Sequence, residues 1–333
     1  MESLAPQPHD GITENVLKPI LPPELERVIF EMSIEDIVDH LPPTQCALNL
    51  QLTAKRVRSW IRPLFYRVFK GANSPAIFPD FEKHKDLKIE EIGPFIKYLL
   101  YDVYEFSQSR LLHTLRHCPN IEDLAIWCDT YQMSQLYPAI SSFKHVKRLY
   151  AGLGGLTVEQ VQEAPIFQNL THLDLLGLPP NNLLQEFKNL THFGTNTSTE
   201  EPDLADADAV QEHPSSQKVR TALDMVLTLP LLQVVKVYWS NPRANQGPVD
   251  FKDIRIVYLS GTLFQYTEAE WDWTMRANGK MDSWGFVSRI VYARKNNYME
   301  YVPKRVYDPR FFSCEKELDD AGRIWWQSQS SMQ

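Results

Sequence analysis

A short pattern of apolar and polar residues occurs six times along the chain. Its two clearest copies are "FQNLTHL", which starts at Phe167, and "FKNLTHF", which starts at Phe187. The first inward-facing apolar position of the six copies falls at Ile121, Val146, Leu170, Leu190, Leu232 and Ile254. The spacing is 20 to 25 residues, apart from one gap of 42 residues. A weaker copy starts at Ile96, so the pattern indicates a repeating structural unit.

Each copy predicts a strand, and the segments between copies predict helices. Apolar residues return at the fourth and usually the sixth position, as in Leu170, Leu173 and Leu175, which is the alternation of a strand with one buried face. Two intervening segments instead have helical spacing: Met133, Leu136, Tyr137 and Ile140, and Val219, Leu223, Val226 and Leu227. Thr157 and Gln160 have the spacing of a capping box. Each unit is therefore predicted to be helix, turn and strand.

The repeat length resembles that of leucine-rich-repeat proteins, whose units span about 20 to 29 residues. The Asn or Cys usual at the ninth position is missing, so the repeats are degenerate. One unit has no closed core and must stack on its neighbours. We expect an α/β fold in which residues 96–262 form a leucine-rich-repeat-like solenoid.

The strand residues that alternate with the buried ones are expected to line an exposed face. Tyr, Trp and Arg dominate the energetics of protein interfaces, so this mixture favours binding of a target protein. Any solvated sheet would also carry polar residues there. The candidate target-binding residues are Asp123, Trp127, Arg148, Tyr150, His172, Asp174, Lys236, Tyr238 and Tyr258.

Two segments depart from the repeat pattern. Residues 197–217 contain six acidic residues and no Lys or Arg, which predicts a disordered or looped insertion. The C-terminal segment 263–333 is rich in aromatic residues and is expected to cap the open end of the solenoid. A ligand cage is the alternative reading of its five tryptophans, Trp271, Trp273, Trp284, Trp325 and Trp326.

The N-terminal region predicts a small helical module at residues 21–69, after a disordered tail (1–20) and before a linker (70–95). Leu25, Val28 and Ile29 fall on one side of its first helix, and a later helix carries Val57 and Trp60. So short a segment is marginally stable by itself. Its apolar surface therefore packs against the following residues or docks on another protein.

The segments "LPPELERVIF" (21–30), "ALNLQL" (47–52) and "AKRVRSWIRPLFYRV" (54–68) resemble an F-box, in the variant found in mushroom-forming fungi. The later "DSWGFVSRIVYARK" (282–295) also resembles the C-terminal helix of such proteins. The stretch "EMSIEDIVDHLPPTQ" (31–45) departs from the commonest F-box pattern. The resemblance implies docking on the small adaptor subunit of a cullin-RING ubiquitin ligase. By that likeness the adaptor-binding residues are Leu21, Pro22, Glu24, Leu25, Ile29 and Trp60.

Composition narrows the function classes. The net charge of −8 and the pI near 5.6 argue against nucleic acid as a partner. The first residues have neither the pattern of a signal peptide nor that of a membrane span. With four scattered cysteines, this predicts a reducing cytoplasmic or nuclear location and no membrane partner.

Motifs of catalysis and metal binding are weak. "AGLGGLT" (151–157) lacks the third glycine of a dinucleotide-binding turn, so a tight turn explains it. His113 and His117 are four residues apart but lack the Glu of the zinc-protease motif, so we expect a plain surface helix. His172 and His192, at equivalent repeat positions, are expected to stack as neighbours. We expect no enzyme activity, no cofactor and no metal.

The sequence thus predicts a non-catalytic substrate receptor that binds a ligase adaptor through its N-terminal module and an unknown target through its repeats. The first alternative is a repeat scaffold whose N-terminal helices never meet an adaptor. The second is an enzyme with a pocket between the repeats and the tryptophan-rich end.

Overall fold

The computed structural model describes residues 21–38, 45–71, 79–81, 85–102, 108–127, 130–178, 181–197, 214–239, 251–260, 266–303, 305–308 and 314–330. The expected N-terminal tail (1–20) and most of the expected acidic insertion (198–213) lie outside these residues.

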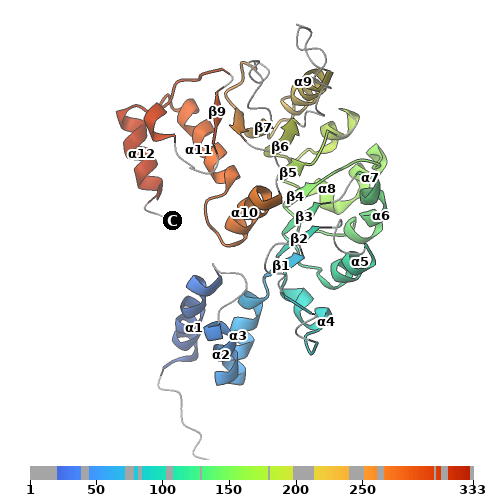
Figure 1. The fold of residues 1–333 in the computed structure, drawn as a ribbon, viewed down its shortest axis with the longest axis vertical. Helices are drawn as coiled ribbons and strands as arrows, with labels where there is room; N and C mark the ends of the chain where they lie inside the picture. Colours follow the sequence, from blue (N-terminus) through green and yellow to red (C-terminus); the bar gives the residue numbers. More distant parts are fainter. Residues whose placement is uncertain are drawn as a thin grey trace, which may run out of the picture.

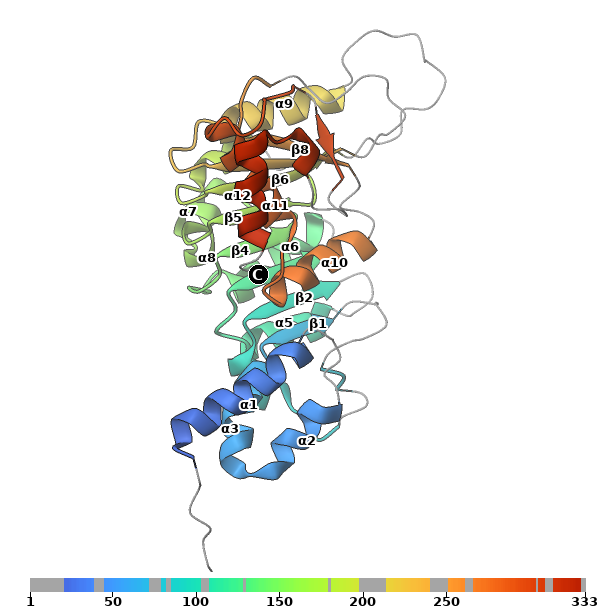
Figure 2. The same cartoon turned by 90° about the vertical axis from the view of Figure 1, so that its left-hand side faces the viewer.

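Three helices lie at the N-terminal end. They are α1 (Pro23–Val38), α2 (Gln45–Thr53) and α3 (Lys55–Phe65). Helix α1 begins at Pro23. Proline lacks a backbone N–H, and the first turn of a helix accepts it because N–H groups there have no partner within the helix. Ile34 of α1 packs against Val57, Ile61 and Phe65 of α3 in a small core of its own. Figure 2 shows these helices together at the end of the sheet where β1 lies.

The centre of the molecule is one parallel sheet whose nine strands lie side by side in chain order. The strands are β1 (Val68–Gly71), β2 (Tyr98–Asp102), β3 (Asp123–Trp127), β4 (Arg148–Ala151), β5 (His172–Leu175), β6 (His192–Thr197), β7 (Val234–Trp239), β8 (Ile256–Ser260) and β9 (Val306–Tyr307). Strands β2 to β8 each begin two residues after the first apolar position of a sequence copy, from Ile96 to Ile254. The predicted strand positions are therefore confirmed.

One face of the sheet is covered by the helices that connect its strands (Figure 1). They are α4 (Ile89–Ile92), η1 (Gly93–Phe95), α5 (Gln108–His117), α6 (Thr130–Ile140), α7 (Val158–Glu163), α8 (Pro165–Gln168), η2 (Asn181–Glu186) and α9 (Pro214–Val226). The predicted inward faces of α6 and α9 are confirmed, since Met133, Leu136, Leu223 and Val226 are buried. Thr157 and Gln160 form the predicted capping box of α7.

The opposite face is covered by the C-terminal segment. Helices α10 (Tyr266–Ala277), α11 (Ser283–Lys295) and α12 (Asp320–Ser330), with the short η4 (Glu315–Glu317), lie on this side (Figure 1). Trp273, Trp284 and Trp326 are buried in a second core that also contains Val257 and Leu259 of β8. These three tryptophans therefore help to seal a face of the sheet, whereas Trp271 is exposed and Trp325 half-buried.

The α/β class is confirmed, but the rest of the expected fold is wrong. We expected an N-terminal F-box-like helical module, a leucine-rich-repeat-like solenoid and an aromatic-rich C-terminal cap. Instead, the described chain builds a nine-stranded parallel sheet between two helical layers, and its first strand follows α3 after two residues. The repeat pattern reports only which strand residues face α4–α9, so it leaves open what covers the other face.

Candidate functional site

The candidate target-binding residues are brought together, but they are not exposed. Eight of the nine lie on the sheet face that α10 and α11 cover, and Tyr258 belongs to the core on the other face. Arg148 and His172 are half-buried. Buried are Asp123, Trp127, Tyr150, Asp174, Lys236, Tyr238 and Tyr258. The expected open face is therefore wrong, because the C-terminal helices occupy it.

Arg276 of α10 anchors the covering layer to Asp123 of β3. Its Nε lies 2.7 Å from Asp123 Oδ2, and its Nη1 lies 3.5 Å from Asp282 Oδ2. The indole Nε1 of Trp273 donates to Asp123 Oδ1 at 3.2 Å. A buried carboxylate needs such charged and polar partners to offset its lost hydration. Lys70 of β1 forms a further buried ion pair with Glu270 of α10.

Lys236 of β7 is the centre of a second buried polar group. Its Nζ lies 3.0 Å from Asp174 Oδ1, donates to Ser283 Oγ at 2.9 Å, and lies 3.9 Å from the ring centroid of Trp284. The Trp284 indole N–H donates to Asp174 Oδ2 at 2.8 Å. The charges that we expected to meet a target are therefore satisfied by each other and by side chains of α11.

His172 and His192 form the predicted stacked pair, with ring centroids 4.0 Å apart and planes at 11°. The Trp284 ring meets both edge-on, at 5.6 and 5.4 Å. Burial lowers the pKa of His172 to about 2 and that of His192 to about 4, and the positive charge of Arg148 adds to both shifts. Both rings are therefore neutral at neutral pH and serve as packing surface beneath α11.

In contrast to the target-binding candidates, most of the candidate adaptor-binding residues are exposed. Helical spacing places Leu25, Val28, Ile29 and Met32 along one side of α1, and Leu21 lies two residues before the helix begins. These five residues are here called the α1 face. All five are exposed, with Leu25 at 54%, Ile29 at 50% and Met32 at 61%. An apolar helix face that the described part of the chain leaves uncovered is a typical protein-interaction surface.

The other expected adaptor-binding positions lie around this face. Pro22 and Glu24 are exposed, whereas Trp60 of α3 is half-buried against the Ile34 core. Sequence reasoning missed Leu52 of α2, which is 84% exposed, and Met32. The sequence could have predicted Met32, because it lies four residues after Val28 and therefore on the same side of the helix. Leu52 could not be found in this way, because its exposure depends on how α2 packs.

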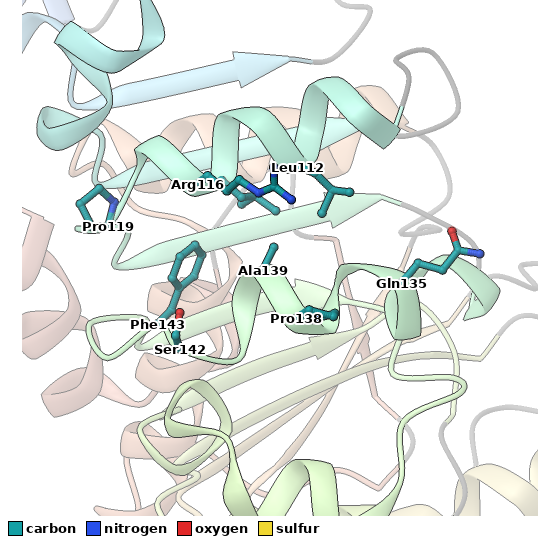
Figure 3. Close-up of a pocket in the computed structure, with 9 residues that line it drawn as sticks. Leu112, Arg116, Pro119, Gln135, Pro138, Ala139, Ser142 and Phe143 are labelled. Carbon is teal, nitrogen blue, oxygen red and sulfur yellow. The ribbon is translucent and has the colours of Figure 1, made fainter.

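A surface pocket of about 510 Å³ lies between α5 and α6 (Figure 3). Its described lining residues are Leu112, Leu115, Arg116, Pro119, Gln135, Pro138, Ala139, Ser142 and Phe143. Arg116 alone among them is charged. Proton transfer by a general acid and base needs a suitably placed titratable pair, which these lining residues do not supply.

The glycines of "AGLGGLT" belong to a turn, as expected. Gly155 has φ of 79°, in the left-handed region that glycine adopts without strain. The turn leads into α7 through the Thr157 cap. No ligand role is needed to explain it.

Comparisons with known proteins add no assignment: no protein-family model and no curated protein matches the chain. Among the described helices, none combines the length and the apolar character that crossing a membrane requires.

Proposed function

We propose that this protein is a substrate receptor of a cullin-RING ubiquitin ligase and that the α1 face docks on the small adaptor subunit of the ligase. The observation that carries the proposal is the exposure of this face, from Leu21 to Met32. The resemblance of residues 21–68 to an F-box supplies the class of partner. A buried α1 face would have left no surface for an adaptor to cover.

Burial of apolar side chains would favour docking on the α1 face. Full burial of one such side chain stabilises a complex by roughly 1.5–3 kcal/mol. The side of α1 that faces α3 is held in place, since Glu26 forms an ion pair with Arg56 of α3 at 2.6 Å. The face is therefore presented on helices that already pack together, which lowers the ordering cost of binding.

Target presentation is the second part of the proposal. Because α10 and α11 occupy the sheet face, the target binds to surfaces outside it. The receptor acts by proximity, raising the local concentration of target lysines near the ligase. It needs no catalytic residue or cofactor, and it works in the cytoplasm or nucleus.

A scaffold without adaptor binding is the second candidate. The N-terminal helices are tied to the sheet layer, because Arg62 of α3 forms an ion pair with Glu91 of α4 at 2.8 Å. The Arg62 guanidinium also lies 6.0 Å from the ring centroid of Phe95. This attachment favours a structural role in which the three helices close the β1 end of the sheet.

Co-purification of the full chain with the adaptor separates the two candidates. The double variant Leu21→Asp with Ile29→Asp places two carboxylates on the α1 face. Loss of one hot-spot contact costs about 2 kcal/mol, or roughly 30-fold in Kd, so the double variant is expected to lose the adaptor. Its unfolding free energy should change by less than about 0.5 kcal/mol per site.

The matched control is Leu231→Asp with Ile324→Asp, at two exposed apolar positions away from α1. The control should retain the adaptor. The scaffold hypothesis is supported instead if the wild-type chain does not bind the adaptor, or if the α1 variant binds it as tightly as the control does.

A further inference from the structure

Three side chains from two helices converge beside the N-terminal end of the sheet. Glu90 of α4 and His113 and His117 of α5 place one carboxylate oxygen and two imidazole nitrogens within 4.8 Å of one another. Glu90 Oε1 lies 3.7 Å from His113 Nε2. The sequence shows the two histidines, whereas the glutamate lies more than twenty residues before them and is added by the fold.

The backbone fixes the approach of α4 to α5. Gly93 follows α4, and a Cβ atom there would lie 2.1 Å from the carbonyl oxygen of His117. Only glycine permits this contact. Asn120 Nδ2 donates to the Pro94 carbonyl at 2.8 Å, and Ile92 is fully buried. Glu90 therefore faces α5 because of packing and hydrogen bonds that do not involve its carboxylate.

His117 is oriented as a metal-bound histidine usually is. His113 and His117 are four residues apart on α5, and their ring centroids are 4.7 Å apart. His117 Nδ1 lies 3.0 Å from the carbonyl oxygen of His113, so Nδ1 carries the proton. Such a bond leaves Nε2 unprotonated, with its lone pair available to a metal, and is the common outer-shell arrangement of a metal-bound histidine.

We infer that Glu90, His113 and His117 bind a zinc ion, with water at the fourth position. Imidazole and carboxylate suit zinc, and the same set disfavours magnesium and calcium, which prefer oxygen ligands. Zinc bonds of about 2.1 Å place tetrahedral ligand atoms about 3.4 Å apart. The observed separations, 3.7 Å between Glu90 and His113 and at most 4.8 Å within the group, exceed this value by about 1.4 Å or less, and the Glu90 and His113 side chains are exposed.

The inferred zinc ion ties α4 to α5. Helix α4 also contacts α3 through Glu91 and Arg62. The ion therefore fastens the joint between the N-terminal helices and the sheet. This role is independent of adaptor binding.

Titration calorimetry of the full chain with zinc tests the inference. Wild-type protein should bind zinc at this site, and His113→Ala should weaken that binding by at least the roughly 10- to 100-fold that outer-shell changes cause. Glu90→Gln and His117→Ala should each have the same direction of effect. His145→Ala, at an exposed histidine outside the group, is the matched control and should bind as wild type does.

Cobalt substitution supplies a second readout. The wild-type cobalt spectrum should show tetrahedral d–d bands without a thiolate charge-transfer band, and His113→Ala should lose these bands. Equal zinc affinity in wild type, His113→Ala and His117→Ala would overturn the inference. Unchanged affinity in Glu90→Gln alone would overturn the assignment of Glu90.

Discussion

At the scale of single residues, one missing side chain makes room for a buried ion pair. Asp174, Gly194 and Lys236 are aligned across three neighbouring strands, β5, β6 and β7. The carboxylate of Asp174 and the ammonium of Lys236 meet above Gly194, 3.0 Å apart. A Cβ atom at position 194 would lie 2.0 Å from Asp174 Oδ1 and 2.8 Å from Lys236 Cε. The pair therefore depends on glycine at this position.

Gly194→Ala should destabilise the protein strongly. The added methyl group forces the two charges apart inside the core, and breaking a buried pair costs about 3–5 kcal/mol. Denaturant unfolding measures this loss. Gly177→Ala is the control, because a Cβ atom there has no neighbour within 4 Å, and it should change the unfolding free energy by less than about 0.5 kcal/mol. Equal stability of the two variants would contradict this account of Gly194.

The stacked histidines predict a loss of stability in acid. Their pKa values in the folded state, about 2 for His172 and about 4 for His192, lie below the unfolded value near 6.5. The unfolded chain therefore binds protons first as pH falls. The contribution of the two rings to the unfolding free energy is complete above pH 6.5. As the pH falls below 6.5 this contribution is lost, down to about pH 4 for His192 and to a lower pH for His172. Each ring is expected to lower the unfolding free energy by roughly 2 kcal/mol as the pH falls from 6.5 to 5.

Unfolding free energies between pH 7 and 5 check this prediction. His192→Gln should flatten the dependence relative to wild type, whereas His145→Gln, at an exposed position, should leave the slope unchanged. An unchanged slope in His192→Gln would show that the buried ring binds protons as readily as an unfolded one.

The sequence located several of these residues but not their partners. Period-two alternation placed Asp174, Lys236 and the two histidines on one sheet face, and that placement is correct. Trp284 and Arg276 come from a segment more than 35 residues after the last of those strands, and local periodicity carries no information about such contacts. The residues were therefore assigned to a target when their partners were in the same chain.

At the scale of elements, the covering helices are held to the sheet by charge as well as by apolar packing. Arg276 of α10 reaches Asp123 of β3, and Lys236 of β7 reaches Ser283 of α11. The sequence predicted β2 to β8, because their spacing is regular. It missed β1 and β9, which lie outside the repeats, and it placed the C-terminal segment at an end of the sheet.

Arg276→Met should loosen this layer. The substitution leaves Asp123 buried without its cation, at a cost of about 3–5 kcal/mol. Unfolding free energy and limited proteolysis of residues 266–330 report the change. Arg323→Met removes an exposed pair with Asp320 and is the control, because exposed pairs contribute about 0–1 kcal/mol. Equal protection of α10 from protease in both variants would contradict the anchoring role of Arg276.

At the scale of the whole molecule, the two surfaces that the sequence predicts as binding faces differ in whether the chain covers them. The sheet face is sealed by α10 to α12, whereas the α1 face at the far end remains exposed (Figures 1 and 2). The mixed polar and aromatic sheet face is covered, whereas the apolar α1 face is exposed. That contrast is the physical basis of the proposed adaptor docking.

Hydrogen–deuterium exchange of the full chain, with and without the ligase adaptor, tests this claim most directly. Docking should slow amide exchange in Pro23–Val38, while Asp320–Ser330, in the layer of C-terminal helices, should exchange as before. Absence of binding, or binding without any protection of Pro23–Val38, would contradict the proposal.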